Sequence, residues 1–447
     1  MAARAKVLLY AASPINNPGG PGDPLPSERF TDLVDDQGRL LMGQEYNEEK
    51  WAKAVAAARD VVEMGKRGVY RLYTVKARSE GTIDYPATIT PPFHDIYSGE
   101  NYPDGWADID PLQSYQNLFN GNLYPSDNPE MVFTTGQNFN AYWLAQRGMP
   151  IEIGGSNCYA MSGKQCDAYE MNNGTPFDKK KKYTGDDMYI STEEEKNGLY
   201  APLRQGVNKR YAHREPRFYA SCAYNGTFWP ATSAELPENR NKQVFYYRGT
   251  ESGWGISNNV LRTGIGVMKY ISTRDNGKAG TIIAKPVVGI RYADVLLWYA
   301  EALNELNPGA QYTIPSWDGK QSYTITRDEE EMHYAIKRVR LRAGLPDYDT
   351  DVYQNQKTFR QKLKHERQIE FFAENSRYFD LRRWKDAQEE ESMPITGCNI
   401  YMSETARDYF HTQVTLSDIP TTFNRKMYFW PISKNELNKN FRMTQNP

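Results

Sequence analysis

The sequence predicts a mostly α-helical protein in which helical hairpins form a scaffold around a long irregular insertion with minor β-strands. Two observations carry this prediction. Residues 1–77 and 286–392 repeat apolar side chains at helical spacing. Residues 78–285 are instead rich in Gly, Pro, Asn, Asp and Tyr and show no long helical period. Residues 393–447 are again irregular, and we expect this tail to pack on the scaffold.

The first part of the chain contains two predicted helices. Residues 1–12 have the character of a helix end, because Ser13-Pro14 follows and the residue before a proline disfavours the helical conformation. After a connector rich in Pro and Gly, a second helix is predicted from Glu48 to Met64. One face of this helix carries Trp51, Ala54, Val55, Ala58, Val61 and Val62. Alanines between larger side chains let helices approach closely, as in hairpins of the TPR kind.

The middle of the chain has the composition of loops. Residues 101–106 and 221–227 contain the Asn, Asp, Gly and Ser that are typical of turns. Short β-prone runs at 244–247, 266–271 and 281–284 predict minor strands. Because a long irregular stretch inside a compact protein commonly carries function, we expect the ligand-binding region here.

Helical sequence returns in the last third. A helix is predicted from Arg291 to Leu306, and the following Pro308-Gly309 ends it. Its apolar stripe consists of Tyr292, Val295, Leu296, Tyr299 and Leu303. A second helix is predicted over 328–341, where acidic residues at the start suit the helix dipole. A third, long amphipathic helix is predicted from 358 to about 388.

Composition excludes several classes of protein. The chain has 54 Lys and Arg against 56 Asp and Glu, which argues against a nucleic-acid partner. No stretch approaches the ~20 apolar residues of a membrane span. The four cysteines form no CxxC pair and the five histidines are scattered, so we predict no zinc site, while bound Ca²⁺ stays open. We also predict no cofactor, because Gly264-Ile-Gly266 lacks the third Gly of a dinucleotide-binding loop. Cys158 and Cys166 are close enough in sequence to pair in an oxidising compartment, and spacing alone leaves that disulfide open.

Three C-terminal segments resemble the SusD/RagB family of outer-membrane nutrient-binding lipoproteins. They are residues 291–305 (RYADVLLWYAEALNE), 366–384 (ERQIEFFAENSRYFDLRRW) and 428–437 (YFWPISKNEL), in the order and spacing of the family. Residues 165–169 and 214–219 also match. The resemblance extends over essentially the whole chain. The family's N-terminal part, with its secretion signal and lipid-attached cysteine, is not in this sequence.

The resemblance implies a SusD-like fold and a function in nutrient uptake. It implies a non-catalytic protein at the bacterial outer membrane that captures an oligosaccharide or polysaccharide and delivers it to a SusC-like TonB-dependent transporter. Membrane attachment would come only from a lipid anchor that precedes the present sequence. Trp298, Trp384 and Trp430 lie inside the family segments, and we expect them in the core. Asn375 stands where the family commonly has Gly, which predicts a break in the long helix there.

The charged residues of these segments predict a polar network between packed helices. Glu366, Glu370 and Arg377 share a helical face, with Arg367 and Asp380 nearby. A glycosidase would need two carboxyl groups that face each other across a cleft, one with a raised pKa. Two carboxylates one turn apart point the same way, and neighbouring arginines lower their pKa values. We therefore predict no catalytic residues; a surface glycoside hydrolase or a TPR-like protein-interaction scaffold remains the alternative.

Aromatic side chains of the irregular middle are the candidates for ligand contact. Tyr and Trp offer sugars a flat apolar face and a hydrogen-bonding edge at low entropic cost. One candidate group is Trp106, Tyr142 and Trp143. The other is Trp229, Tyr246, Tyr247 and Trp254, with Asn225, Asn239 and Arg248 as polar partners. Ligand residues vary across the family, so no motif assigns these positions one by one.

Overall fold

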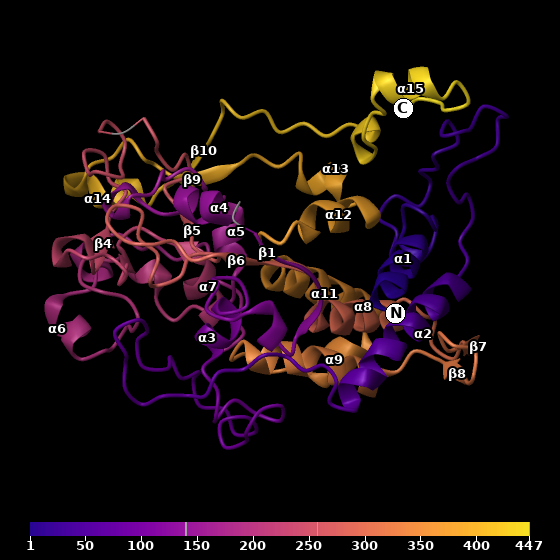
Figure 1. The fold of residues 1–447 in the computed structure, drawn as a ribbon, viewed down its shortest axis with the longest axis horizontal. Coiled ribbons are helices and arrows are strands. Elements are labelled where there is room, and N and C mark those ends of the chain that lie inside the picture. Colours follow the sequence, from indigo (N-terminus) through magenta and orange to yellow (C-terminus); the bar gives the residue numbers. More distant parts are fainter. Residues whose placement is uncertain (139–140, 257, 447) are drawn as a thin grey trace.

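The computed structural model describes residues 1–138, 141–256 and 258–446. The chain forms two packed parts (Figure 1). Long helices gather in one part, and short helices, strands and loops form the other. The helical part combines distant segments of the sequence, because the two N-terminal helices pack against the helix that begins at Tyr292.

Six helices make up the scaffold. They are α1 (Ala2–Ala12), α2 (Glu49–Lys66), α8 (Tyr292–Asn304), α9 (Glu329–Arg342), α10 (Thr350–Gln354) and α11 (Gln356–Glu370). Helix α8 lies at the centre, in contact with α1, α2, α9 and α11. All 13 of its residues are buried, so its charged and polar side chains must find partners inside the protein. The helices predicted over 1–12, 48–64, 291–306 and 328–341 are confirmed.

The amphipathic stretch predicted from 358 to about 388 forms three helices: the predicted break at Asn375 is confirmed, and a second break at Lys385 was not predicted. Helix α11 ends at Glu370, and α12 (Ser376–Arg383) and α13 (Ala387–Glu390) follow. Asn375 has φ +62° immediately before α12, as the substitution for Gly predicts. Lys385 has φ +62° between α12 and α13. A left-handed residue cannot continue a right-handed helix, so the chain turns at each of these points.

The described residues contain five two-stranded antiparallel sheets. The pairs are β1 (Met131–Asn138) with β6 (Lys285–Arg291), β2 (Cys222–Ala223) with β5 (Gly266–Val267), β3 (Thr227–Trp229) with β4 (Lys242–Val244), β7 (Tyr312–Pro315) with β8 (Ser322–Ile325), and β9 (Thr396–Cys398) with β10 (Gln413–Thr415). Of the predicted runs, 266–271 contributes β5 and 244–247 only the end of β4. The run at 281–284 precedes β6 and is not a strand.

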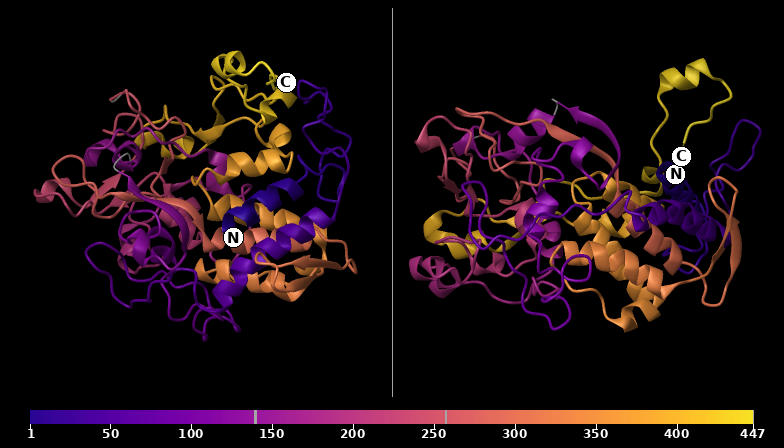
Figure 2. Two further views of the ribbon diagram at one scale, coloured as in Figure 1. Left: turned by 45° about the vertical axis from the view of Figure 1, so that its right-hand side comes forward. Right: turned by 60° about the horizontal axis from the view of Figure 1, so that its bottom comes forward.

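Short helices complete the irregular part and the tail. They are α3 (Pro111–Gln116), α4 (Ala141–Gly148), α5 (Gly163–Ala168), α6 (Thr192–Lys196), α7 (Pro216–Ser221), α14 (Arg407–Phe410) and α15 (Lys434–Lys439). In the right-hand view of Figure 2 the segment with α15 projects beyond the scaffold. Trp430 lies in this segment and is 71% exposed, so its prediction as a core residue is wrong. Trp298 and Trp384 are buried, as predicted.

A buried ionic network joins the two parts. Arg217, on α7, donates to Glu366 (2.5 Å) and Glu370 (2.8 Å) on α11. Arg291, at the start of α8, donates to Glu370 (2.7 Å) and to Glu130 (2.8 Å), which precedes β1. Each of these side chains is at most 1% exposed. The predicted network therefore exists, and its arginines come from several elements.

Three sequence expectations around this network and the cysteines have separate outcomes. Arg367 binds Asp380 through two contacts of 2.9 and 3.1 Å, which fits the predicted charge pairing. Arg377 was predicted on the face of Glu366 but instead pairs with Glu390 (3.2 Å), because the chain turns before it. Cys158 and Cys166 are both free: Cys158 is exposed and Cys166 is buried in the core of the irregular part. No disulfide joins them.

Candidate functional site

The first predicted aromatic group does not assemble as one surface. Trp106 is buried against Tyr97 and Leu341, so it has no free face for a ligand and we leave it out of the candidate site. Trp143 is exposed on α4, with the guanidinium carbon of Arg147 5.9 Å from its ring centroid. The side chain of Tyr142 lies outside the described residues.

Most of the second group forms the support of a surface and not the surface itself. Trp229, Tyr246 and Tyr247 are buried in the core of the irregular part. Asn225 is also buried, and its side-chain oxygen accepts a hydrogen bond from the Tyr246 N–H at 2.6 Å. Asn239 is partly buried in a short 3-10 turn, and its carbonyl accepts from Asn276 at 2.8 Å. These contacts hold the chain on both sides of β4, at Asn239 before it and at Tyr246 after it.

The rest of the second group reaches the surface and meets the C-terminal tail there. Trp254 is 36% exposed and lies against Tyr401, which is 52% exposed. Their ring centroids are 5.0 Å apart and their planes meet at 74°, the edge-to-face arrangement that aromatic pairs favour. The exposed Arg248 lies nearby, because its backbone N–H donates to the carbonyl of Met402, the residue after Tyr401, at 2.9 Å. We call Arg248, Trp254 and Tyr401 the aromatic platform.

Backbone and side-chain hydrogen bonds hold the platform loop in one conformation. The Gly249 N–H donates to the Trp254 carbonyl at 2.9 Å, which closes the loop onto its own start. The hydroxyl of Thr250 donates to the carbonyls of Phe245 (2.7 Å) and Tyr247 (2.8 Å). A ring held in this way loses little conformational entropy when it contacts a ligand. The platform thus has the rigidity that sugar recognition requires.

One platform residue could not be found from the sequence. Tyr401 lies in the tail that follows β9, far from the irregular middle in sequence. Its neighbours in sequence include no motif that marks a binding residue. The edge-to-face contact with Trp254 is the signal, and it appears only after folding.

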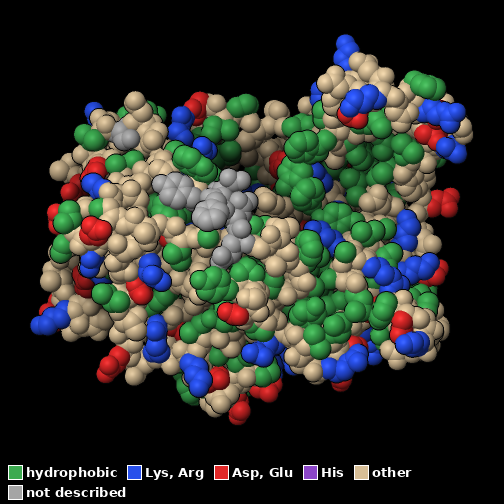
Figure 3. Space-filling model, viewed as in Figure 1, with side chains coloured by type: hydrophobic (Ala, Val, Ile, Leu, Met, Phe, Trp, Pro, Cys, Tyr) green, Lys and Arg blue, Asp and Glu red, His purple; other side chains and the backbone are tan. Residues whose placement is uncertain are grey.

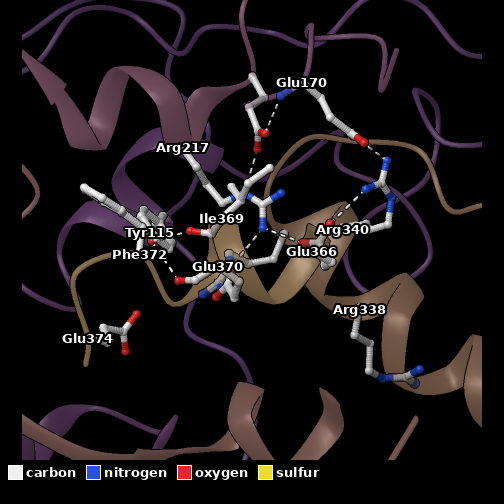
Figure 4. Close-up of polar contacts among 12 residues, drawn as sticks. Tyr115, Glu170, Arg217, Arg338, Arg340, Glu366, Ile369, Glu370, Phe372 and Glu374 are labelled. Atoms are coloured by element: carbon white, nitrogen blue, oxygen red, sulfur yellow. Dashed lines mark hydrogen bonds and ion pairs between the residues drawn. The ribbon is translucent and has the colours of Figure 1, made fainter. Parts of the chain in front are cut away.

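The carboxylates considered for glycoside hydrolysis are unsuited to that chemistry. Glu366 and Glu370 are completely buried at the centre of the ionic network (Figure 4). Burial raises the pKa of Glu370, but the guanidinium groups of Arg342, Arg291 and Arg217 outweigh burial and hold this pKa well below its ordinary value. Neither carboxyl group reaches a cleft, and a general acid needs a raised pKa. Their contacts instead link α11 to Arg217 of α7 and to Arg291 at the start of α8.

Other surface features are poorer candidates for sugar binding. On the face of the molecule that Figure 3 shows, apolar side chains gather over the helical part. A hollow of about 630 Å³ with a mostly apolar lining lies there between α1 and Phe379. Two of its polar side chains already form hydrogen bonds within the protein: Asn16 donates to the Tyr10 carbonyl at 3.0 Å, and Lys50 donates to the Asn16 carbonyl at 2.9 Å. This leaves fewer free partners for sugar hydroxyls than the platform offers. Within the described residues, no three His, Cys, Asp or Glu side chains are placed to hold a metal ion.

A mostly helical scaffold with small two-stranded sheets is the SusD-like fold. The model of the SusD family matches residues 119–447, well over half of the chain. The chain therefore belongs to the SusD family. Members of this family are typically surface lipoproteins of the outer membrane and generally non-catalytic binding proteins. None of the described helices has both the length and the apolar composition that crossing a membrane requires.

Solved structures agree with this assignment at the level of the fold. A protein named BT4246 is 20% identical with a TM-score of 0.72, and the match covers 100% of this chain and 72% of BT4246. A SusD-like protein from Bacteroides fragilis is 22% identical with a TM-score of 0.57, with 89% of this chain and 62% of that protein covered. No curated protein sequence matches the chain.

Proposed function

We propose that this protein binds a glycan at a bacterial cell surface, without catalysing a reaction, through the aromatic platform. The single observation that carries the proposal is the exposed edge-to-face pair of Trp254 and Tyr401 on an anchored loop. Aromatic rings contact the apolar faces of pyranoses, and the guanidinium of Arg248 supplies hydrogen-bond donors for sugar hydroxyls. Membership of a family of binding proteins supports the same function.

Delivery of the glycan to a SusC-like TonB-dependent transporter is the second part of the proposal. Family membership supports it, since SusD proteins are typically found at the outer-membrane surface. The protein would hold the glycan near the transporter and release it there. Co-purification of a TonB-dependent transporter with the tagged, lipid-anchored protein from detergent-solubilised outer membranes tests this step. Recovery of the tagged protein without any such transporter would contradict it.

Affinity gel electrophoresis against a panel of polysaccharides tests glycan binding, followed by titration calorimetry with the retained ones. We expect retardation by at least one polysaccharide and no new reducing ends after prolonged incubation. Loss of retardation in Trp254→Ala, but not in Trp317→Ala, would place the ligand on the platform. Trp317 is a suitable control because it is an exposed tryptophan next to the β7–β8 hairpin. Release of reducing ends would instead indicate a hydrolase, and the absence of retardation a scaffold protein.

A further inference from the structure

A cavity of about 410 Å³ lies beside the β3–β4 hairpin. This volume is within the range of about 300–1,000 Å³ that small-ligand pockets occupy. Its wall consists of residues 81–86, Pro202, Arg204, Tyr219, Tyr224, Phe228 and several neighbours. None of the three platform residues lines it. We call this space the Arg204 cavity.

Arg204 presents an uncommitted positive charge to this cavity. Its guanidinium carbon lies 3.2 Å from the centroid of the Phe228 ring, so the ring supports one face of the group. Stacking of this kind leaves the N–H edge of a guanidinium available for an anion that can accept two hydrogen bonds. No described residue forms a hydrogen bond or ion pair with the side chain of Arg204. The nearby carboxylate of Glu195 accepts a hydrogen bond from the Gln205 N–H at 2.8 Å and does not line the cavity.

A tyrosine in the wall also offers an unpaired hydroxyl to the cavity. Tyr224 is 5% exposed, and its ring stacks on Phe218 with centroids 5.9 Å apart. No described residue forms a hydrogen bond with its hydroxyl. By contrast, the hydroxyl of Tyr219 in the same wall donates to the Tyr211 carbonyl at 2.8 Å and accepts from the Arg214 N–H at 3.1 Å. The Tyr224 hydroxyl is therefore free to donate a hydrogen bond to a ligand in the cavity.

The carboxylate of Glu195 lies close enough to attract the Arg204 guanidinium, but it forms no ion pair with it and does not line the cavity. Of the described residues that line the cavity, only Asp84 is acidic, and its carboxylate already accepts a hydrogen bond from the Thr232 hydroxyl at 2.7 Å. Asp84 also lines a second hollow of about 410 Å³, whose wall includes Asn122 and the exposed Arg274. Two arginines therefore flank one committed carboxylate, which favours an anionic ligand over a neutral one.

We propose that the Arg204 cavity binds a sugar unit that carries a carboxylate or sulfate group, so that the protein prefers acidic glycans. The guanidinium of Arg204 pairs with the anionic group, and the hydroxyl of Tyr224 donates to the same sugar. Arg–carboxylate and Arg–sulfate pairs of this geometry combine charge with two parallel hydrogen bonds. This inference rests on the proposed function, because it names the chemical class of the glycan.

Titration calorimetry with matched polymers tests the inference. The probes are polygalacturonate with its carboxyl-reduced form, and chondroitin sulfate with its desulfated form. We expect at least one acidic polymer to bind about 10-fold more tightly than its neutral counterpart, as charge-assisted hydrogen bonds provide. Arg204→Gln should reduce this preference to less than about 2-fold, and Arg204→Lys should retain part of it because the charge stays but the planar fork is lost. Lys196→Gln removes an exposed charge of α6 outside the cavity and should change nothing.

A second variant keeps the test decisive if Arg204→Gln destabilises the protein. Tyr224→Phe removes only the unpaired hydroxyl, so the melting temperature should stay the same while binding of the acidic polymer weakens severalfold. Equal binding of the acidic and neutral forms, with the platform variant Trp254→Ala still deficient, would overturn this inference and leave glycan binding intact. Absence of binding to every polymer, including the neutral ones of the panel, would overturn both.

Discussion

The rings of Trp254 and Tyr401 meet edge to face at 74° with 5.0 Å between centroids, although one residue belongs to the irregular middle and the other to the tail. This contact turns two separately anchored segments into one exposed aromatic surface. Arg248 lies next to this surface, because its backbone N–H donates to the Met402 carbonyl. The contact therefore carries the proposed function.

Truncation of the platform should weaken glycan binding and leave folding intact. We expect Trp254→Ala and Tyr401→Ala each to weaken binding by about 1–3 kcal/mol, by analogy with aromatic stacking on nucleobases. Because Trp229 is buried, Trp229→Ala should instead lower the free energy of unfolding by about 3–5 kcal/mol. Calorimetric titration and denaturant unfolding measure the two effects. If Trp254→Ala lowers stability while affinity stays the same, Trp254 is a structural residue.

Removal of one carboxylate from the ionic network should be strongly destabilising. Glu370→Gln leaves Arg217, Arg291 and Arg342 without their shared partner in a site that water does not reach. Loss of one partner from a buried ion pair costs about 3–5 kcal/mol. Guanidinium unfolding at pH 7 measures this cost. The control is Glu436→Gln, which breaks an exposed pair with Lys439 and should leave stability almost unchanged; equal effects of the two substitutions would contradict a structural role for the network.

Acid should destabilise the protein partly through His411. Burial, with a smaller contribution from the charge of Arg210, lowers the pKa of His411 to about 3. The unfolded state, with a His pKa of about 6.5, therefore takes up a proton before the folded state does. Stability that is present above pH 6.5 is lost as the pH falls towards 3. Between pH 6 and 4.5 this loss should approach about 2 kcal/mol, since each unit is worth 1.36 kcal/mol.

The variant His411→Phe isolates this contribution. The phenyl ring keeps the edge-to-face contact with Phe410, which has centroids 5.2 Å apart, and cannot titrate. Burial also lowers the pKa of His365, but that contribution is the same in both proteins and cancels. Denaturant unfolding from pH 7 to 4.5 should show a smaller loss of stability in the variant. Parallel curves for the two proteins would exclude His411 as a source of the pH dependence.

The turn between α11 and α12 should tolerate glycine but not alanine at residue 375. Asn375 is exposed and has φ +62°, so the identity of this residue affects stability through its tolerance of a left-handed backbone. A left-handed alanine costs about 1–2 kcal/mol, whereas glycine adopts this conformation freely. In thermal unfolding, Asn375→Gly should have a melting temperature close to that of the unsubstituted protein, and Asn375→Ala a lower one. Ala373 has φ +59°, and Ala373→Gly should therefore raise the melting temperature; the opposite order in either series would refute the backbone argument.

Local sequence determined the scaffold and the family. Periodic apolar side chains and the Pro and Gly residues that follow them predicted the main helices to within a few residues, because helix formation depends on neighbours along the chain. The same local signal explains the turn at Asn375, where a residue that tolerates the left-handed region replaces glycine. It also predicted charge pairing around Glu366 and Glu370.

Tertiary structure alone decided which side chains are buried and which meet a ligand. Trp229 and Trp254 stand in the same irregular stretch, yet one is in the core and the other at the surface. Trp430 looked like a core residue by its motif and is 71% exposed, with an edge-to-face contact of its ring to Tyr378 of α12 and a hydrogen bond between them. Exposure depends on contacts between residues far apart in sequence, as when Tyr401 supports Trp254 or when Arg217 crosses to Glu366. No pattern along the chain encodes those contacts, so the sequence predicted the kinds of residue at the site and the fold selected among them.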